Sequence, residues 1–294
     1  MGWLDTVVFM VSPNVDGVNV HKSKIRSPFR YPGGKSWLAP QITQWVGSFG
    51  GPPSVFVDLF GGGGSVALLV AEQRLAQRVL LVEKDPEVAA VWHTIIYGDF
   101  ERFACEIERF KLSVNTVDTV LGSDPGDRFG LAFRTIIKNR VNYGGVLAPG
   151  AGRIGSGENG RGLSSRWYPD TLAKRVREIG SYRDRVCFLE TDAFEVLPAL
   201  NDVADVLFFV DPPYSVGGKK AGRRLYRYHE LDHDELFLRL GGCRGDFLMT
   251  YDNSVEVKQL VQRHGLVWRE VVMRGNRNVR DRELLIGRKL GWVV

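Results

Sequence analysis

Short apolar runs recur along this chain and are separated by longer stretches in which polar and apolar residues mix. Seven of the runs predict β-strands, because each is short, rich in valine, leucine or phenylalanine, and bounded by turn or charged residues. The predicted strands are Ser54–Phe60, Val79–Asp85, Val186–Asp192, Val206–Val210, Asp246–Tyr251, Leu266–Met273 and Glu283–Leu290.

Helical patterns lie between most of these strands, namely Ser65–Leu75, Pro86–Ile96, Leu172–Ile179, His233–Leu240 and Val255–His264. Strands that alternate with helices predict an α/β fold with a Rossmann-like, mostly parallel seven-stranded sheet covered on both faces. The last two strands have no helix between them. Their polar nine-residue link, Arg274–Arg282, predicts an antiparallel hairpin at one end of the sheet.

The alternation breaks between about Asp99 and Tyr182. This stretch contains one predicted helix, Phe129–Lys138, and then a glycine-rich basic segment from Asn139 to Arg166. A long irregular insertion in a compact domain is usually functional, so we expect a second, smaller lobe at 99–182. The α/β domain would then comprise 26–98 and 183–294, behind a loose arm at 1–25.

Composition narrows the class of protein. Of the 294 residues, 44% are hydrophobic and 25% are charged, a balance typical of soluble globular proteins, and the net charge of +5 weakly favours a polyanionic partner. No apolar run is long enough to predict a transmembrane helix, and the N-terminus is a poor signal peptide. Three widely spaced cysteines, Cys105, Cys187 and Cys243, disfavour a disulfide framework or structural zinc and favour a reducing compartment such as the cytoplasm.

One motif follows a predicted buried strand directly: Asp211-Pro212-Pro213-Tyr214 comes after Val206–Val210. Two prolines cannot continue a strand, so the chain must leave the sheet there in a stiff turn. This places a carboxylate, a carbonyl and an aromatic ring at the carboxyl end of a strand, where open α/β sheets bind ligands. The three groups suit a flat ring with an exocyclic amine, which would stack on Tyr214 and donate to Asp211 and the Pro212 carbonyl.

A glycine loop joins the first predicted strand to a helix through Asp58, Phe60 and the run Gly61-Gly62-Gly63-Gly64. Glycine permits a tight turn and lets a ligand approach the backbone and the helix N-terminus. The strict dinucleotide fingerprint fails when it is counted from Gly61, and only its relaxed form fits from Gly62. The pattern fits better a loop around the amino-acid half of S-adenosylmethionine, and an ordinary glycine turn is the alternative.

Glu83 lies near the end of the second predicted strand, about 20 residues beyond the glycines. An acidic residue at this place can accept hydrogen bonds from both hydroxyls of a ribose. The alternative is that Glu83 is an ordinary surface carboxylate. Its spacing from the glycine loop favours the ribose-binding interpretation.

A further glycine-containing motif precedes the first strand: Phe29-Arg30-Tyr31-Pro32-Gly33-Gly34-Lys35-Ser36. Its last three residues are similar to a phosphate-binding loop. That loop requires a glycine where Phe29 stands and a strand before it, so a nucleoside triphosphate site is disfavoured. We expect Lys35 to point at a carboxylate or to anchor a nearby loop.

The string His229-Glu230-Leu231-Asp232-His233 matches the zinc-protease pattern. Zinc binding requires both histidines on one face of a single helix. Asp232 with Glu235 predicts a capping box, so the helix should begin after Asp232 and separate the two histidines. We therefore expect no zinc site here.

Basic residues gather in three places: before Tyr31, after the Asp-Pro-Pro-Tyr turn, and in the terminal hairpin. Each could be a solvated face. Two of the clusters lie beside the predicted binding edge, which supports contact with the phosphates of a nucleic acid.

Together these segments resemble the Dam-type N6-adenine DNA methyltransferases over about residues 28–294. The Pro-Gly-Gly-Lys segment, the glycine loop, an insertion and Asp-Pro-Pro-Tyr occur in the family's order. Further matching segments are Asn139-Arg140-Val141-Asn142-Tyr143-Gly144-Gly145, Arg166-Trp167-Tyr168-Pro169, Thr250-Tyr251-Asp252-Asn253 and Glu283-Leu284-Leu285-Ile286.

The resemblance implies a site-specific enzyme that uses S-adenosylmethionine to methylate a flipped-out adenine in double-stranded DNA, within a restriction–modification system or outside one. It implies cofactor contacts at Tyr31, Lys35, Asp58, Phe60, Gly61, Gly63, Glu83 and Asp211, and a loop beside the cofactor adenine at Asp192-Ala193-Phe194. It implies DNA contacts at Arg140, Tyr143, Arg153, Lys219, Lys220, Arg274 and Arg277.

Two departures limit what can be carried over. Four consecutive glycines stand where the family usually has alanine or serine between two glycines, and Leu147–Arg153 does not match the recognition segment of the best-known members. The target sequence is therefore left open. An RNA adenine methyltransferase and a non-catalytic DNA-binding protein of the same fold remain alternatives, whereas cytosine or glutamine methylation is disfavoured because those relatives usually carry serine or asparagine at the position of Asp211.

Overall fold

The computed structural model describes residues 26–293, apart from 32, 158–159, 215, 217–224, 226, 229 and 275–279. The side chains of 272–274, 280 and 281 are likewise outside the description. The predicted arm at 1–25 therefore lies outside the described residues, as do Lys219, Lys220, Arg277 and the side chain of Arg274.

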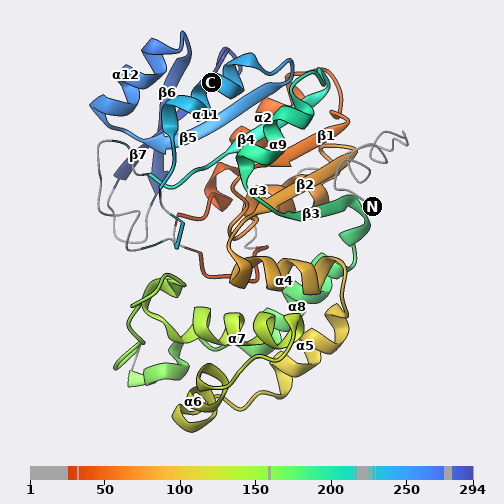
Figure 1. Ribbon diagram of the computed structural model, residues 1–294, viewed down its shortest axis with the longest axis vertical. Helices are drawn as coiled ribbons and strands as arrows, with labels where there is room; N and C mark the ends of the chain where they lie inside the picture. Colours follow the sequence, from red (N-terminus) through yellow and green to blue (C-terminus); the bar gives the residue numbers. More distant parts are fainter. Residues whose placement is uncertain are drawn as a thin grey trace.

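A seven-stranded sheet in the order β3-β2-β1-β4-β5-β7-β6 forms the centre of the molecule (Figure 1). Strands β1 to β5 are parallel, and β7 is antiparallel to both β5 and β6. This confirms the predicted fold class, and the first five strands follow the usual doubly wound order. The strands are β1 Val55–Asp58, β2 Arg78–Glu83, β3 Val186–Glu190, β4 Val206–Val210, β5 Asp246–Asp252, β6 Val267–Arg274 and β7 Arg280–Gly287.

The terminal hairpin differs from its prediction in length. β7 begins at Arg280 rather than Glu283, and Arg274 pairs with Arg280, so the nine-residue polar link is partly strand. β5 ends at Asp252 opposite Glu283, which leaves this end of the hairpin paired only with itself. The start of β7 reads Arg280-Asp281-Arg282, a polar run without the apolar pattern by which strands are predicted.

Helices cover both faces of the sheet (Figure 1). Successive residues of β4 point to opposite faces: Leu207 and Phe209 pack with α2, α3 and α4, and Phe208 and Val210 pack with α9, α11 and α12. The helices are α2 Ala39–Gly47, α3 Ser65–Glu72, α4 Pro86–Ile96, α5 Phe100–Arg109, α6 Val114–Gly122, α7 Arg128–Val141, α8 Pro169–Gly180, α9 Ala193–Leu200, α11 His233–Gly242 and α12 Val255–Arg263.

Among the helices in the described part of the chain, the sequence patterns missed α2, α5, α6 and α9. Only Phe103, Ala104 and Ile107 of α5 are buried, among charged residues, and α6 buries only Val117. Ala193 and Phe194, which the resemblance placed in a loop, begin α9, and Asp192 caps this helix by accepting a hydrogen bond from the Phe194 amide at 2.9 Å. Such short or sparse helices gain most of their stability from packing rather than from local pattern.

The insertion at 99–182 forms the helical part below the sheet in Figure 1. Its helices α5, α7 and α8 bury Ile107, Ile136 and Val176 in the same core as α4 and one face of the sheet. Short 3-10 turns, η2 Tyr143–Gly145 and η4 Gly162–Arg166, follow α7. The division of the chain into two lobes stays a prediction. Within the described residues, no helix has the length and apolarity needed to cross a membrane.

Candidate functional site

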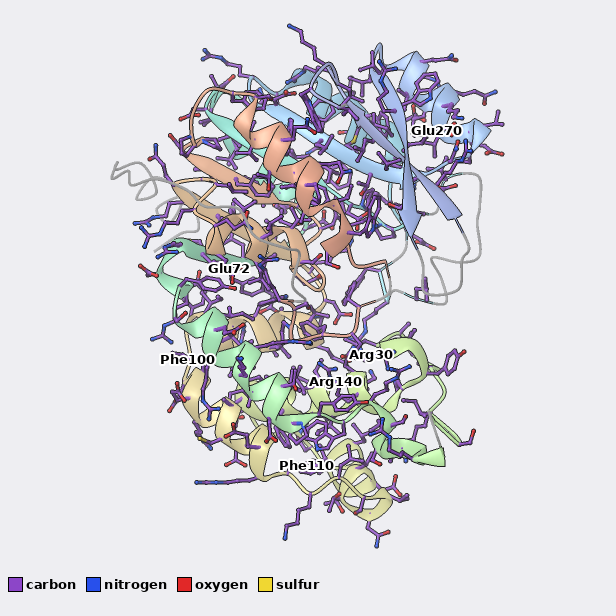
Figure 2. All side chains as sticks on the ribbon, turned by 180° about the vertical axis from the view of Figure 1, so that it is seen from behind. Arg30, Glu72, Phe100, Phe110, Arg140 and Glu270 are labelled. Carbon is purple, nitrogen blue, oxygen red and sulfur yellow. The ribbon has the colours of Figure 1, made fainter. Side chains whose placement is uncertain are left out.

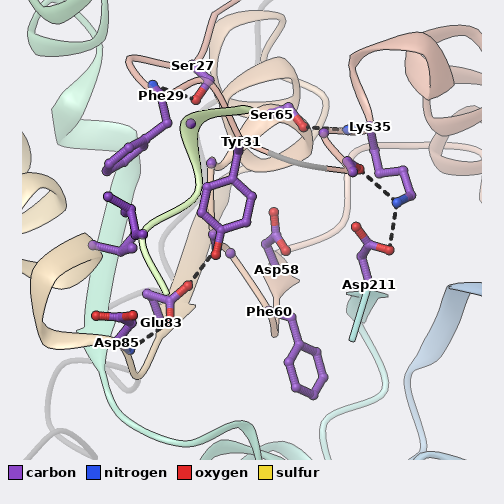
Figure 3. Close-up of a pocket in the computed structure, with 18 of the residues that line it drawn as sticks. Ser27, Phe29, Tyr31, Lys35, Asp58, Phe60, Ser65, Glu83, Asp85 and Asp211 are labelled. Carbon is purple, nitrogen blue, oxygen red and sulfur yellow. Dashed lines mark hydrogen bonds and ion pairs between the residues drawn. The ribbon is translucent and has the colours of Figure 1, made fainter. Parts of the chain in front are cut away.

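A cavity of about 480 Å³ lies at the carboxyl ends of β1, β2 and β4 (Figure 3). Its volume is within the range typical of small-molecule sites, about 300–1,000 Å³. Most residues that the sequence assigned to a cofactor or to catalysis line it: Tyr31, Lys35, Asp58, Phe60, Gly61, Gly63, Glu83, Asp192, Ala193, Asp211 and Pro213. Pro212, Tyr214 and Phe194 are not among the described residues of its wall.

The glycine loop is closely packed on its own neighbours. At Gly62, where φ is +46°, an added Cβ would lie 2.7 Å from the ring of Tyr31. At Gly64, where φ is +63°, it would lie 2.7 Å from the ring of Trp92. Both positions need a residue without a side chain, for conformation and for space. The run of four glycines, unusual for the family that the chain resembles, therefore accommodates two aromatic rings.

Asp58, the last residue of β1, is 2% exposed and points into the cavity (Figure 3). Its Oδ2 accepts a hydrogen bond from the Ala67 amide at 3.3 Å, and its Oδ1 has no hydrogen-bond partner among the described residues. Burial raises the pKa of this carboxyl well above its usual value, and the nearby Asp211 raises it further. A buried acceptor without a donor is unfavourable, so this oxygen is suited to a cationic donor on a ligand.

Glu83, the last residue of β2, holds the glycine loop from the other side. It accepts hydrogen bonds from the amides of Gly62 and Asp85, both at 2.8 Å. Burial raises the pKa of Glu83 to about 7. Each of the two Glu83 carboxylate oxygens thus accepts from a backbone amide of the loop that follows a strand.

Three donors meet on one oxygen of Asp211. Its Oδ1 accepts hydrogen bonds from the hydroxyls of Thr250 at 2.6 Å and Tyr214 at 3.0 Å, and Lys35 Nζ lies 2.9 Å away. Lys35 is 3% exposed and also contacts the Gly33 carbonyl at 2.8 Å and Glu283 Oε2 at 3.6 Å. Lys35 thus points at a carboxylate, as its sequence context predicted. Because these three donors all use Oδ1, Oδ2 has no donor among the described residues and can accept from a ligand.

The sequence suggested that the Tyr214 ring faces the cavity, but the ring is not part of the cavity wall. Its ring stacks on Tyr251 with centroids 5.7 Å apart and planes 21° from parallel. Burial, Asp211 and Glu283 raise the pKa of the Tyr214 hydroxyl well above its usual value, so it stays protonated and donates. The two prolines restrict the backbone of this turn. The direction of the Tyr214 side chain is set by its hydroxyl group, which lies within hydrogen-bond distance of Asp211 and of Glu283 on β7.

Thr250 and Glu283 were missed as site residues, although both lie in segments that match the family. Val210 pairs with Met249, so Asp211 comes opposite Thr250 in the parallel register of β4 and β5. Glu283 arrives from β7, paired with Asp252. A polar residue inside an otherwise apolar strand was the available signal for Thr250.

Asp192 and Phe194 take different positions. Burial would raise the pKa of Asp192, but hydrogen bonds from Lys84 Nζ and the Phe194 amide lower it below its usual value. The Phe194 ring packs against the core on the face of the sheet that α9, α11 and α12 cover, and the Arg239 guanidinium lies 5.1 Å from the ring centroid. Asp192 and Ala193 therefore line the cavity, and the Phe194 side chain does not.

The opposite wall of the cavity is basic and includes Arg30, Arg140, Arg166 and Arg175. Figure 2 shows Arg30 and Arg140 at the junction between the sheet and the helices of the insertion. Burial, Arg175 and Arg30 lower the pKa of Arg140 to about 9, so the guanidinium stays charged at neutral pH. The cavity is thus acidic on the sheet side and cationic on the insertion side.

The predicted DNA-contacting residues are not all on an open surface. Arg140 is 5% exposed and donates to the Pro28 carbonyl, and its contact with DNA stays a prediction. Tyr143 is 77% exposed, and Arg153 forms an exposed ion pair with Asp118.

The predicted start of α11 is confirmed: the helix begins at His233, and Asp232 accepts a hydrogen bond from the Glu235 amide at 2.9 Å. His229 lies outside the described residues. Among those that are described, no three His, Cys, Asp or Glu side chains come together as metal ligands. The three cysteines are all unpaired.

No family model and no curated protein matches the sequence. Among solved structures, a candidate RNA methyltransferase from Pyrococcus horikoshii aligns over 89% of this chain and 87% of its own, with 11% identity and a TM-score of 0.39. A candidate transferase from the same organism aligns over 85% of this chain and 62% of its own, with 11% identity and a TM-score of 0.33. Likenesses at this level carry no argument about activity.

Proposed function

We propose that this protein is an S-adenosylmethionine-dependent DNA methyltransferase that acts on the N6 amine of adenine. The observation that carries the proposal is one cavity with two distinct carboxylates. Asp58 is buried and one of its oxygens has no partner in the described part of the chain, whereas Asp211 is oriented through one oxygen by three donors. The first suits a cationic amino-acid group, and the second suits an exocyclic amine.

The described residues fit the parts of S-adenosylmethionine, which would supply an electrophilic methyl group on a cationic sulfur. Asp58 Oδ1 can accept from its ammonium group. Glu83, at the end of the strand next to the glycine loop, can accept from the ribose hydroxyls. Asp192 and Ala193 line the same cavity and would lie beside the cofactor adenine. The acidic side of the cavity also favours a ligand with positive charge.

Asp211 would hold and orient the target amine. The lone pair of an adenine amine is spread into the ring, so the amine is a weak nucleophile. Hydrogen bonds to Asp211 Oδ2 and to the Pro212 carbonyl would favour the pyramidal geometry needed for attack and stabilise the positive charge that develops. Placing the amine in line with the methyl group supplies much of the remaining acceleration. Asp211 need not remove a proton in the rate-determining step, because the methylated ammonium is itself acidic.

An adenine in duplex DNA must swing out of the helix to reach this cavity, which costs a few kcal/mol. Tyr214 would then have to leave Tyr251 to stack on the extruded base. The insertion at 99–182 would recognise the target, with the cationic wall and the exposed Tyr143 on the nucleic-acid side. Lys219, Lys220, Arg274 and Arg277 would add phosphate contacts, and Arg153 would have to exchange Asp118 for a phosphate.

The proposal is tested by incubating the protein with tritiated S-adenosylmethionine and either duplex DNA or RNA of the same sequence. Label in N6-methyladenosine after nuclease digestion of the DNA is expected. Label confined to RNA would favour the RNA methyltransferase alternative. Cofactor binding without transfer to either polymer would favour the non-catalytic DNA-binding protein, and no cofactor binding would reject the proposal. Sequencing methylated DNA would give the target site.

Replacing Thr250 by valine should lower kcat roughly ten- to hundredfold, because a buried hydrogen bond to a charged group contributes about 1.5–3 kcal/mol. The valine leaves the shape of the site unchanged but frees the Asp211 carboxylate to rotate. Cofactor affinity should stay within about twofold, and Thr250→Ser should restore kcat.

Thr94→Val is the matched control, since Thr94 is also buried but bonds to a helix carbonyl, that of Ala90, at 2.8 Å. It should leave kcat unchanged. Equal losses in the two valine variants would contradict a role for Thr250 in orienting Asp211.

Cofactor affinity should depend on the ionisation of Glu83. With a pKa of about 7 in the free protein, this carboxyl goes from about nine-tenths ionised at pH 8 to about one-tenth at pH 6. Since the ionised form is the better acceptor for ribose hydroxyls, affinity should weaken by up to roughly tenfold over this interval. Calorimetric titrations at both pH values should show this for the wild type and a much smaller change for Glu83→Gln. The same pH dependence in both proteins would exclude Glu83 as its source.

A further inference from the structure

The segment 26–31 forms one wall of the cofactor cavity. Its last residue, Tyr31, packs on the glycine loop so closely that a Cβ at Gly63 would lie 2.8 Å from the Tyr31 Cβ. Phe29 contacts both Tyr31 and Trp92, with ring centroids 6.2 and 5.8 Å apart. The position of Tyr31 over the glycines therefore depends on how this segment is held.

The insertion holds the segment through its backbone. Asn139, at 0% exposure on α7, accepts from the Arg30 amide at 2.9 Å and donates to the Arg30 carbonyl at 2.9 Å. The same side-chain amide donates to the Gly145 carbonyl at 2.7 Å. One asparagine thus joins the segment, α7 and η2.

The neighbouring contacts act on the same segment. Arg140 donates to the Pro28 carbonyl, and Arg175 of α8 donates to the Ser27 carbonyl at 3.4 Å. At Gly145, where φ is +77°, an added Cβ would lie 2.1 Å from the Arg30 carbonyl oxygen. The clasp formed by Asn139, Arg140, Gly145 and Arg175 therefore leaves the segment little freedom to move.

We propose that Asn139 is a positioning residue for cofactor binding, acting through the Arg30 backbone on Tyr31. The proposal rests on the proposed function, because it takes Tyr31 to contact S-adenosylmethionine. The family-like segment that begins at Asn139 would thus support the cofactor pocket although it belongs to the insertion. Asn139 itself need not contact S-adenosylmethionine or the nucleic acid. By linkage, a nucleic acid that displaces α7 or η2 changes cofactor affinity, and the cofactor changes nucleic-acid affinity by the same factor.

The chain offers a matched control in Asn142, another buried asparagine of the same segment. Its side-chain amide donates to the Val146 carbonyl at 2.7 Å, within its own loop, and does not reach the 26–31 segment. Asn139→Ala and Asn142→Ala thus each remove a buried amide, and only the first releases Arg30. S-adenosylmethionine binding is measured by calorimetry without nucleic acid, after thermal unfolding has established that each variant is folded at the working temperature.

Asn139→Ala should weaken S-adenosylmethionine binding at least tenfold, and Asn142→Ala by less than twofold. A double-mutant cycle with Tyr31→Ala supplies the readout that a general loss of stability would not give. If Asn139 acts through Tyr31, adding Asn139→Ala to Tyr31→Ala should change the affinity by less than twofold. Equal effects of the two asparagine variants, or additive effects with Tyr31→Ala, would overturn the positioning role.

A second pair of variants tests the clasp without altering Asn139, which matters if Asn139→Ala does not fold. Gly145→Ala pushes a methyl group against the Arg30 carbonyl, whereas Gly144→Ala carries a similar left-handed strain, at φ +67°, and its Cβ meets nothing closer than 3.7 Å. Gly145→Ala should weaken S-adenosylmethionine binding more than Gly144→Ala, and the reverse order would count against the clasp. A wild-type protein that does not bind S-adenosylmethionine would instead refute the proposed function, independently of Asn139.

Discussion

Replacing Asp211 by alanine is expected to lower methyl transfer at least about 10³-fold, since the variant loses the acceptor that orients the amine and stabilises its developing charge. This corresponds to about 4 kcal/mol of transition-state stabilisation. Nucleic-acid binding should be retained, because the cationic wall on the insertion side is untouched. Transfer of a tritiated methyl group and a separate DNA-binding assay measure the two effects.

Asparagine at the same position should be nearly as inactive as alanine, for a reason specific to this network. Lys35, Thr250 and Tyr214 all donate toward Oδ1, so an asparagine would keep its carbonyl oxygen on that side. Its NH2 group would then face the target amine, donor against donor. Asp211→Asn should fold better than Asp211→Ala and still fail to transfer methyl groups.

Asp205 offers a matched control, because it precedes the same strand at its opposite end and bonds to Ser54. Asp205→Ala should leave methyl transfer unchanged. Appreciable transfer by Asp211→Asn would show that the acceptor can be supplied by an amide, and the assigned orientation of the Asp211 carboxylate would be wrong.

Replacing Lys35 by methionine is expected to lower the free energy of unfolding by about 3–5 kcal/mol at pH 8, the usual effect of breaking a buried ion pair. Lys35 Nζ lies between Asp211 at 2.9 Å and Glu283 at 3.6 Å, and the lysine side chain is 4% exposed. Without it, the buried Glu283 carboxylate and the half-buried Asp211 carboxylate lose the cation that lies between them.

The loss of stability should be smaller at pH 5. Burial raises the pKa of Glu283, Lys35 opposes that shift, and Asp211 adds to it. Removing Lys35 therefore raises the Glu283 pKa further. An acid whose pKa is higher in the folded state favours folding while it is protonated, and this contribution is lost as the pH rises through the folded pKa. Denaturant unfolding at the two pH values measures the difference.

Lys84 provides the comparison for Lys35, because its ion pair with Asp192 is about one-third exposed on both sides. Lys84→Met should cost at most about 1 kcal/mol, since exposed ion pairs contribute little. Adding Glu283→Gln to Lys35→Met should recover part of the lost stability. A loss from Lys35→Met that is the same at pH 5 and pH 8 would contradict repulsion between the two carboxylates as its cause.

The position of the candidate site follows from the sequence, because buried strands are visible as local patterns. Apolar runs located all seven strands of the sheet. Asp58 and Glu83, which end β1 and β2, and Asp211, which directly follows β4, were identified as candidate site residues. Parallel strands bring their carboxyl ends to one edge, so three residues far apart in the chain could be expected in one cavity. Helices with sparse apolar faces, such as α5 and α9, could not be found in this way.

The arrangement inside the site was decided by contacts between distant segments. Thr250 reaches Asp211 through the register of β4 and β5, and Glu283 reaches Lys35 only after β7 has paired beside β5. The inward turn of Tyr214 follows from these acceptors and from the stack on Tyr251.

The sequence by itself determined the fold class and which carboxylates share an edge, because strand burial and strand order are expressed locally along the chain. Only the tertiary structure decided which oxygen of Asp211 stays open, and that Arg140 holds the Pro28 backbone from a buried position. Hydrogen-bond direction and burial depend on partners 39 and 112 residues away, and no pattern within a single segment encodes them.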